Sequence, residues 1–547
     1  MLASIFDRGP IMRPHIPLAL LPFLAACLRV VPAFAGGFHL TDATIADLNA
    51  AFKAGTLTSE QLVSLYLRRI EAYDKQGPSI NAVITLNPHA LTTARALDVE
   101  RRTKGPRSPI HGVPIVLKDN FDTFDLPTTA GSLLLKGLIP PDDAFVVNKL
   151  REAGAVILAK VNLNEFADRG YAPHGFSSLG GQTRNPHDPS KNPAGSSGGT
   201  GAAIAAAFAQ FGLGTDTGGS IRMPSSVNGI VGLRPTHDLL SRDGIVPISH
   251  SFDTAGPMAR SVYDVAVSLG LMTGVDAADD ATKTSAGNSE TDYTKFLQRG
   301  ALKGVRIGVA RDFFKGDDET DRVVESAVAK LKELGVVVVD PVNFPEYLLV
   351  ASSAISLAVQ RPEFKVHIAG YLATLKPGYP RTLADLVAKA EALGSAYTNP
   401  GKVVKWKEGL AAPELDDPAY LAAKHEGRAF IRAMVLATFA RYQLDALVYP
   451  TSPRPAQPVE RGASESGGGR TVLAKGFANV TGFPELIVPA GMTKDGLPVT
   501  ISFFGTAFSE GRILGFGYDF EQATKARVLP KYTPALPDER IELASHK

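Results

Sequence analysis

Hydrophobic residues recur with helical spacing near the start of the chain, between Leu40 and Asp74. Gly55 stands where a helix C-cap belongs, and Thr58-Ser59-Glu60-Gln61 has the pattern of a capping box that opens a second helix. We therefore expect two helices here. Their apolar face would pack into the core through Leu62, Leu65, Tyr66, Ile70 and Tyr73.

Short apolar runs then alternate with helical segments along most of the chain. The expected strands cover residues 112–117, 155–159, 211–214, 305–309, 336–339, 446–449, 486–488 and 499–504, and the expected helices include 144–153 and an Ala-rich one over 202–210. This alternation predicts an α/β fold with a large, mixed, mostly parallel twisted sheet and helices on both faces. Residues 277–292 and 452–470 are polar or Pro/Gly/Ser-rich and are expected to be surface loops.

The N-terminus has the features of an export signal. A short apolar run, Leu18 to Leu28, is followed by Ala33-Phe34-Ala35, an A-x-A cleavage pattern. We expect residues 1–35 to be a signal peptide, with Met12 as an alternative start, and 36–547 to form one exported domain, periplasmic or secreted. The run is too short for a permanent transmembrane helix. Leu24-Ala25-Ala26-Cys27 also resembles a lipobox, so a lipid anchor at Cys27 is the second interpretation.

Composition excludes several classes of function. Lys and Arg total 57 against 55 for Asp and Glu, which gives no electrostatic footprint for nucleic acid. Cys27 is the only cysteine, so a chain cleaved after Ala35 has neither disulfides nor a catalytic thiol. No pair of histidines has convincing metal spacing, and His111, His174 and His187 are interpreted as structural. We expect no metal and no cofactor.

The chemistry concentrates in a Gly/Ser-rich stretch between residues 175 and 232. It lacks the Lys-Ser or Lys-Thr pair of a phosphate loop, and Ile204 replaces the third glycine of a dinucleotide fingerprint. Gly195-Ser196-Ser197-Gly198-Gly199 does match a nucleophile elbow centred on Ser197. However, no strand precedes this motif and no late histidine stands out, so the match is weak.

Five segments, three of them reaching into or lying within this stretch, form a recognisable set: residues 112–120 around a lysine, 195–199 around a serine, 214–222 around a second serine, 228–236, and 482–489. In these segments the chain strongly resembles the amidase signature family. Within the family, segments 180–186, 241–249 and 253–260 are most similar to those of the peptide amidases, although Thr217-Gly218-Gly219 follows the general family pattern.

This resemblance implies a catalytic triad of Lys118, Ser196 and Ser220, with Ser220 as nucleophile and Ser196 as a proton relay. It also implies a cis peptide bond between Gly195 and Ser196. The backbone N–H groups of Thr217, Gly218, Gly219 and Ser220 are the candidates for the oxyanion hole. A free lysine titrates near pH ~10.4, so Lys118 must be buried deeply enough to lose about three pKa units and act as a base. Asp216 and Arg222, which flank the turn, are interpreted as a structural ion pair.

The expected activity is hydrolysis of linear carboxamide C–N bonds through an acyl-enzyme, with a small-molecule or peptide amide as substrate. Aryl or fatty amide, ester and carbamate hydrolysis on the same triad stay open. A binding protein without activity is disfavoured by the intact triad. A role within an amidotransferase is disfavoured by the export signal. The sequence specifies neither the physiological amide nor the oligomeric state.

Overall fold

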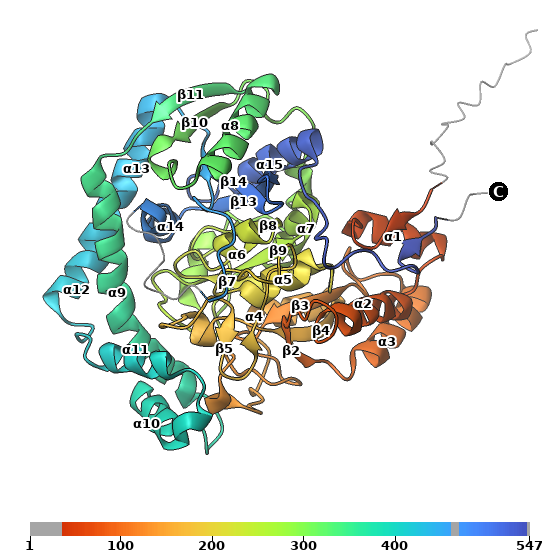
Figure 1. Cartoon of the computed structure of the whole chain (residues 1–547), viewed down its shortest axis with the longest axis horizontal. Helices are drawn as coiled ribbons and strands as arrows, with labels where there is room; N and C mark the ends of the chain where they lie inside the picture. The colour runs from red at the N-terminus through yellow and green to blue at the C-terminus, as the bar shows by residue number, and fades with distance from the viewer. Residues whose placement is uncertain (1–35, 461–469, 544–547) are drawn as a thin grey trace, which may run out of the picture.

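The computed structural model describes residues 36–460 and 470–543. Its centre is a single mixed sheet (Figure 1). The eleven strands, in spatial order, are β11 (Val337–Val342), β10 (Arg306–Ala310), β12 (Ala446–Pro450), β14 (Pro498–Phe504), β13 (Glu485–Met492), β8 (Val231–Arg234), β9 (Thr254–Ala259), β7 (Phe211–Asp216), β3 (Pro114–Lys118), β4 (Val156–Val161) and β2 (Val83–Leu86). The predicted α/β fold with a large mixed sheet is confirmed.

Parallel pairing occurs in two blocks of this sheet. One block joins β11, β10 and β12, and the other joins β7, β3 and β4. Between the blocks, β14, β13, β8 and β9 pair in antiparallel fashion. Strand β7 pairs with β9 of this antiparallel centre on one side and with β3 on the other. It is therefore the first strand of the second parallel block.

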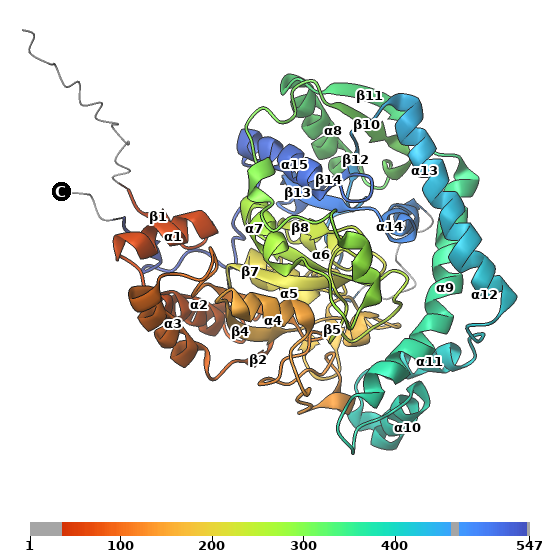
Figure 2. The ribbon, with the colours of Figure 1, turned by 180° about the vertical axis from the view of Figure 1, so that it is seen from behind.

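The helices surround the sheet in both views (Figures 1 and 2). They are α1 (Ile45–Ala54), α2 (Ser59–Tyr73), α3 (Ala90–Lys104), α4 (Phe145–Glu152), α5 (Gly198–Ala205), α6 (Arg222–Val227), α7 (Val262–Met272), α8 (Asp318–Glu333), α9 (Glu346–Ala373), α10 (Leu383–Leu393), α11 (Pro400–Leu410), α12 (Pro418–Ala422), α13 (Arg428–Tyr442), α14 (Arg470–Thr481) and α15 (Glu510–Thr524). Strand β13 shows the two faces. Gly517 of α15 lies against Leu486 and Val488, whereas Arg222 of α6 reaches Glu485 on the opposite side.

Local capping explains where the first helices begin. Thr44 and Thr58 each close a capping box, with Asp47 and Gln61 as their partners. Gly55 ends α1 in the left-handed conformation, with φ +73°. Both predicted helices are confirmed. The Ala-rich helix α5 instead ends at Ala205, earlier than expected, because Ala207 adopts φ +55° and turns the chain into β7.

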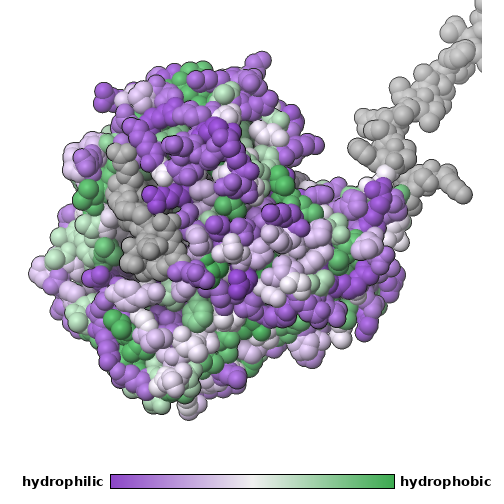
Figure 3. All heavy atoms as spheres, viewed as in Figure 1, coloured by the Kyte–Doolittle hydropathy of each residue, from purple (hydrophilic) through white to green (hydrophobic). Residues whose placement is uncertain are grey.

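Two short sheets complete the fold. Strand β1 (Phe38–His39) pairs with β15 (Arg540–Ile541), so the two ends of the described chain lie side by side. Strands β5 (Phe176–Ser177) and β6 (Gly181–Gln182) form a small hairpin at the start of the Gly/Ser-rich stretch. Hydrophilic residues predominate on the face in Figure 3, with the hydrophobic ones in small scattered groups.

Among the helices of the described residues, none combines the length and apolarity needed to cross a bilayer. The expected signal peptide over residues 1–35, with Cys27, lies outside the described residues. Residues 461–469 of the expected loop at 452–470 also lie outside them.

Candidate active site

Lys118 is the last residue of β3 and is fully buried. Because β3 and β7 are parallel, their C-terminal ends meet at one edge of the sheet. There the Lys118 Nζ donates hydrogen bonds to Ser196 Oγ at 2.7 Å and to Thr215 Oγ1 at 2.7 Å. The structure therefore brings Lys118 and Ser196 into direct contact, as the sequence predicts.

Burial also sets the charge state of this lysine. Desolvation lowers the pKa of Lys118 from 10.5 to about 7, while the carboxylates of Asp216 and Asp253 act in the opposite direction. A substantial fraction of the amine is thus neutral near pH 7 and able to accept a proton. The expectation of a strongly lowered pKa is met.

Ser196 follows a cis peptide bond with Gly195, as the resemblance implies. Asn164 holds this segment in place, because its backbone N–H donates a hydrogen bond to the Ser196 carbonyl at 3.0 Å. A Cβ at position 195 would lie 2.4 Å from the Asn164 side chain, so only glycine fits there. Asn164, which the sequence analysis did not single out, is therefore a positioning residue for Ser196.

The loop that carries Ser220 is built on the buried carboxylate of Asp216. This carboxylate accepts hydrogen bonds from the backbone N–H groups of Gly219 at 2.9 Å and Ile221 at 3.0 Å. Gly219 has φ +107°, a conformation that favours glycine. The short loop is consequently fixed on both sides of the serine.

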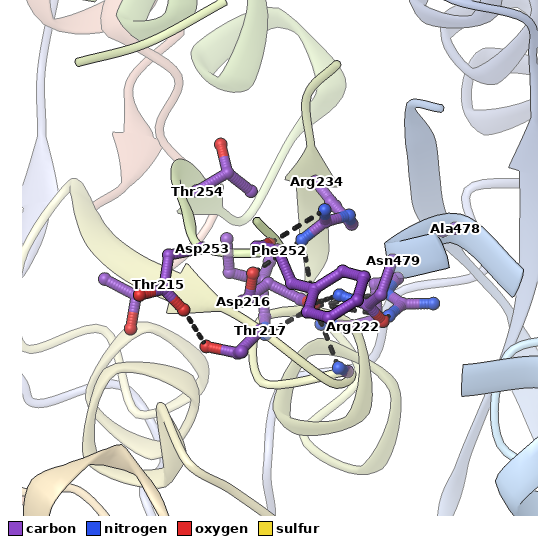
Figure 4. Close-up of polar contacts among 12 residues, drawn as sticks. Thr215, Asp216, Thr217, Arg222, Arg234, Phe252, Asp253, Thr254, Ala478 and Asn479 are labelled. Atoms are coloured by element: carbon purple, nitrogen blue, oxygen red, sulfur yellow. Dashed lines mark hydrogen bonds and ion pairs between the residues drawn. The ribbon is translucent and has the colours of Figure 1, made fainter. Parts of the chain in front are cut away.

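Charged side chains surround Asp216 (Figure 4). Arg222 Nε lies 3.1 Å from Asp216 Oδ2, and Arg234 Nη1 lies 3.2 Å from Oδ1. Arg222 also reaches Glu485 at 2.7 Å, and Asn479 Nδ2 donates to Asp216 Oδ1 at 2.9 Å. Burial alone would raise the pKa of Asp216, but the two guanidinium groups hold it well below its usual range. The predicted ion pair of Asp216 and Arg222 is confirmed, as part of a larger network.

One of the four candidate oxyanion donors is already engaged in this structure. The backbone N–H of Gly219 donates a hydrogen bond to Asp216 Oδ1 at 2.9 Å. Within the described residues, the backbone N–H groups of Thr217, Gly218 and Ser220 make no hydrogen bond. Gly218 is exposed, and nothing lies within 4 Å of the position that its Cβ would take. These three groups are the donors left to face a ligand.

Ser196 and Ser220 border the same cavity, which has a volume of about 390 Å³. Among the residues that the structure describes, no hydrogen bond engages the Ser220 hydroxyl, so Ser196 and Ser220 share the cavity without a direct hydrogen bond between them. Ser197, the alternative nucleophile, is fully buried, and its Oγ donates to the Thr215 carbonyl at 3.2 Å. The geometry thus favours Ser220 over Ser197.

The far wall of the cavity comes from helices α9 and α11, which the sequence analysis did not connect with the site. Leu357, Gln360, Arg361 and Phe364 of α9 line it, together with Lys405, Trp406, Glu408 and Gly409 of α11. The spacing i, i+3, i+4, i+7 in α9 is the sequence feature that could have revealed this face.

The three histidines differ in their placement. His111 and His187 are buried and contact the carbonyls of Leu97 at 2.9 Å and Asn228 at 3.2 Å, as structural histidines do. His174 instead lines the cavity, with its Nδ1 3.2 Å from Asn164 Nδ2. Within residues 36–460 and 470–543, no group of three or more His, Cys, Asp or Glu side chains is arranged to hold a metal ion.

Comparison with known proteins gives consistent matches over most of the chain. The family profile described as "Amidase" matches residues 61–514. The crystal structure of native peptide amidase from Stenotrophomonas maltophilia is 41% identical, with a TM-score of 0.83, over 90% of this chain and 99% of that one. An Arabidopsis thaliana sequence described as a "probable amidase" is 36% identical over 511 residues, which cover 90% of this chain and 92% of its own length. A glutamyl-tRNA(Gln) amidotransferase subunit from Thermoanaerobacter pseudethanolicus is 35% identical over 513 residues, 90% of this chain and 99% of its own.

Proposed function

The chain belongs to the amidase signature family, and on this premise we propose that it is a serine amidohydrolase that cleaves linear carboxamide C–N bonds. One observation carries the proposal. A fully buried lysine, with a pKa lowered to about 7, donates a hydrogen bond to a serine hydroxyl that borders the same cavity as a second serine. Such an amine can act as the general base for a serine nucleophile, so no histidine is needed.

In the proposed reaction, Ser220 Oγ attacks the amide carbonyl carbon. Its proton passes to Ser196 Oγ, while the proton of Ser196 passes to Lys118 Nζ. The Ser220 hydroxyl has no hydrogen-bond partner among the described residues, and it borders the same cavity as Ser196, so nothing competes with this transfer. When the C–N bond breaks, the departing amine takes a proton back along the same relay. Water then attacks the acyl-enzyme with Lys118 again as the base, releasing the carboxylic acid.

The developing negative charge on the carbonyl oxygen needs fixed donors. The backbone N–H groups of Thr217, Gly218 and Ser220 have this role in the proposal, since Gly219 N–H is held by Asp216. Removing one such donor in a serine hydrolase typically lowers kcat by a factor of about 10²–10³.

For the substrate, we propose a C-terminal peptide amide or a related amide. The 41% identity to the Stenotrophomonas peptide amidase over nearly its whole length supports this choice. A cavity of about 390 Å³ offers room for the end of a peptide. Aryl or fatty amides, esters and carbamates are the alternatives on the same triad.

A second candidate is the release of ammonia within an amidotransferase complex, favoured by the 35% identity to the Thermoanaerobacter protein over 99% of its length. The two functions differ in what the isolated chain does. A peptide amidase releases ammonia from a peptide amide without any partner protein. A panel of peptide amides, fatty amides, anilides and carbamates, with product mass spectrometry, separates these activities.

The nucleophile is tested by covalent labelling with a fluorophosphonate. We expect one adduct on Ser220, and no adduct and no turnover in Ser220→Ala. Ser197→Ala is the matched control within the neighbouring motif and should still be labelled. Turnover near the parent rate in Ser220→Ala would refute the assignment.

We also propose that the protein is exported, on the pattern of its first 35 residues. Expression with the natural N-terminus, followed by cell fractionation and intact-mass measurement, tests this. A periplasmic or secreted product that begins at Gly36 is expected, and a lipid-modified Cys27 would support the second interpretation. A full-length cytosolic product would contradict export.

A further inference from the structure

Helix α9 presents one stripe of side chains to the substrate cavity. Leu357, Gln360, Arg361 and Phe364 line it, and their spacing puts all four on one face of the helix. Lys405 and Trp406 of α11 lie on the same wall, and both views show α9 and α11 next to each other (Figures 1 and 2). None of these residues belongs to the triad or the loops around it, so they are placed to contact the part of the substrate beyond the reacting bond.

The charged side chains that line the cavity include more cations than anions. Arg169, Arg361 and Lys405 are cationic, whereas Asp168 and Glu408 are acidic. Both acidic groups already have cationic partners. Asp168 Oδ2 lies 3.4 Å from Lys402 Nζ, and Glu408 Oε2 lies 3.1 Å from Lys405 Nζ. Glu408 also accepts a hydrogen bond from the Tyr171 hydroxyl at 2.8 Å.

Arg361 has no acidic group in direct contact. Across residues 36–460 and 470–543, its guanidinium makes no hydrogen bond and no ion pair, and its side chain is exposed at the cavity. Its charge acts on Glu408 only through space, where it helps to lower the pKa of that carboxyl. A guanidinium carries five N–H donors in a planar fork that matches the two oxygens of a carboxylate. The apolar side chains of Leu357 and Phe364 lie on either side of it along the stripe.

We infer that Arg361 is a specificity-determining residue that binds a carboxylate on the acyl part of the substrate. The preferred substrates are then amides of acidic peptides or of other acyl chains that carry a carboxylate. This inference rests on the proposed function, since it concerns the same site. The alternative is that Arg361 is only a solvated surface cation, in which case its substitution would change kcat/KM equally for neutral and acidic substrates.

The test compares matched substrates that differ only in charge. The probes are N-acetyl tripeptide amides with one glutamate at each position in turn, and the same peptides with glutamine there. The wild-type protein is expected to prefer glutamate at one position. In Arg361→Gln this preference should fall about tenfold in kcat/KM, as expected for loss of one charge-assisted contact, with less than about a twofold change for the glutamine peptide. Arg361→Lys should keep part of the preference because it keeps the charge.

The matched control is Arg102→Gln, which removes the same charge from an exposed arginine of α3 outside the cavity. It should leave the preference unchanged. Dissociation constants for the same peptides, measured calorimetrically with Ser220→Ala, give a readout that does not depend on turnover. The loss in Arg361→Gln should appear there as weaker binding of the glutamate peptide only.

The outcomes separate the two proposals. No hydrolysis of any peptide, together with a glutamate preference in binding that disappears in Arg361→Gln, would overturn the proposed function and support the role of Arg361. Hydrolysis without a glutamate preference at any position, or with one that survives in Arg361→Gln, would overturn the role of Arg361 and leave the function in place.

Discussion

The pH dependence of acylation follows from the burial of Lys118. Its Nζ is sealed from solvent, and desolvation lowers its pKa to about 7. In the proposed relay, only the neutral amine can accept the proton that Ser196 passes on from Ser220. The rate of fluorophosphonate labelling of Ser220 should therefore rise through pH 7 and become constant above pH ~8.

The size of the effect can be worked out from the two pKa values. With a pKa of 10.5, about 0.03% of the amine would be neutral at pH 7, whereas a pKa of about 7 makes about half of it neutral. The gain is a factor of about 10³ in active enzyme. The difference between 10.5 and 7 corresponds to about 5 kcal/mol at 1.36 kcal/mol per pKa unit, an order-of-magnitude figure.

Stability should change in the same direction with pH. The unfolded chain keeps the lysine proton up to about pH 10.4, while the folded protein releases it near pH 7. Between these values the unfolded state binds more protons, so the unfolding free energy rises with pH. Lys118→Met removes this contribution. The wild type should gain stability relative to Lys118→Met across this window, by up to about 1.4 kcal/mol per pH unit.

The assay is quenched labelling at constant ionic strength from pH 5 to pH 10, with urea unfolding of both proteins at the same pH values. Asp253→Asn is the informative control, because the Asp253 carboxylate raises the pKa of Lys118. Its inflection should move to lower pH. An inflection near pH 10, or labelling that is flat between pH 6 and pH 9, would refute the assignment of Lys118 as the base.

Three further predictions concern the supports of the site. Gly219→Ala should cost about 1–2 kcal/mol because of φ +107° and slow the labelling of Ser220 at least tenfold, whereas Gly218→Ala, with open space at its Cβ, should melt like the wild type. Burial raises the pKa of Asp122 from 3.8 to about 7, so the folded protein holds a proton that the unfolded chain releases, and wild-type stability falls as pH rises through this window. In urea unfolding, Asp122→Asn should therefore gain on the wild type by up to about 4 kcal/mol between pH 4 and pH 7, and a constant difference would contradict this. Arg222→Met should lose about 3–5 kcal/mol, seen as a lower Tm, because it leaves Asp216 and Glu485 short of a buried partner; an unchanged Tm would show that the network contributes little.

Local features of the fold were predictable because their causes are local. The capping boxes at Thr44 and Thr58 involve residues three positions apart, and the Thr58 box is legible in the sequence. Strand β3 is a short apolar run that ends at a lysine, and this pattern gave both its place and the burial of Lys118. The pairing directions in the middle of the sheet were less accessible, because they depend on contacts between distant segments such as β8 and β13.

The site divides in the same way. Lys118 and Ser196 could be paired by resemblance, and the structure places them in contact. The hydrogen bond from the Gly219 N–H to Asp216 could not be predicted, because the sequence does not distinguish a glycine N–H that is free from one that is already bonded. The contribution of α9 to the cavity could not be predicted from the sequence, because Arg361 and Ser220 are more than a hundred residues apart in the chain and meet only in the folded structure.

Asp216 couples the shape of the loop that carries Ser220 to the pKa of Lys118. Its carboxylate fixes the Gly219 and Ile221 N–H groups, and its charge opposes the desolvation that lowers the pKa of Lys118. Arg222 and Arg234 are paired with this carboxylate and carry the opposite charge. Asp216 therefore still accepts hydrogen bonds from the loop, while its electrostatic effect on Lys118 is weakened. A change in either arginine should therefore alter the pH profile as well as the fold, and a change confined to stability would show that Asp216 acts on geometry alone.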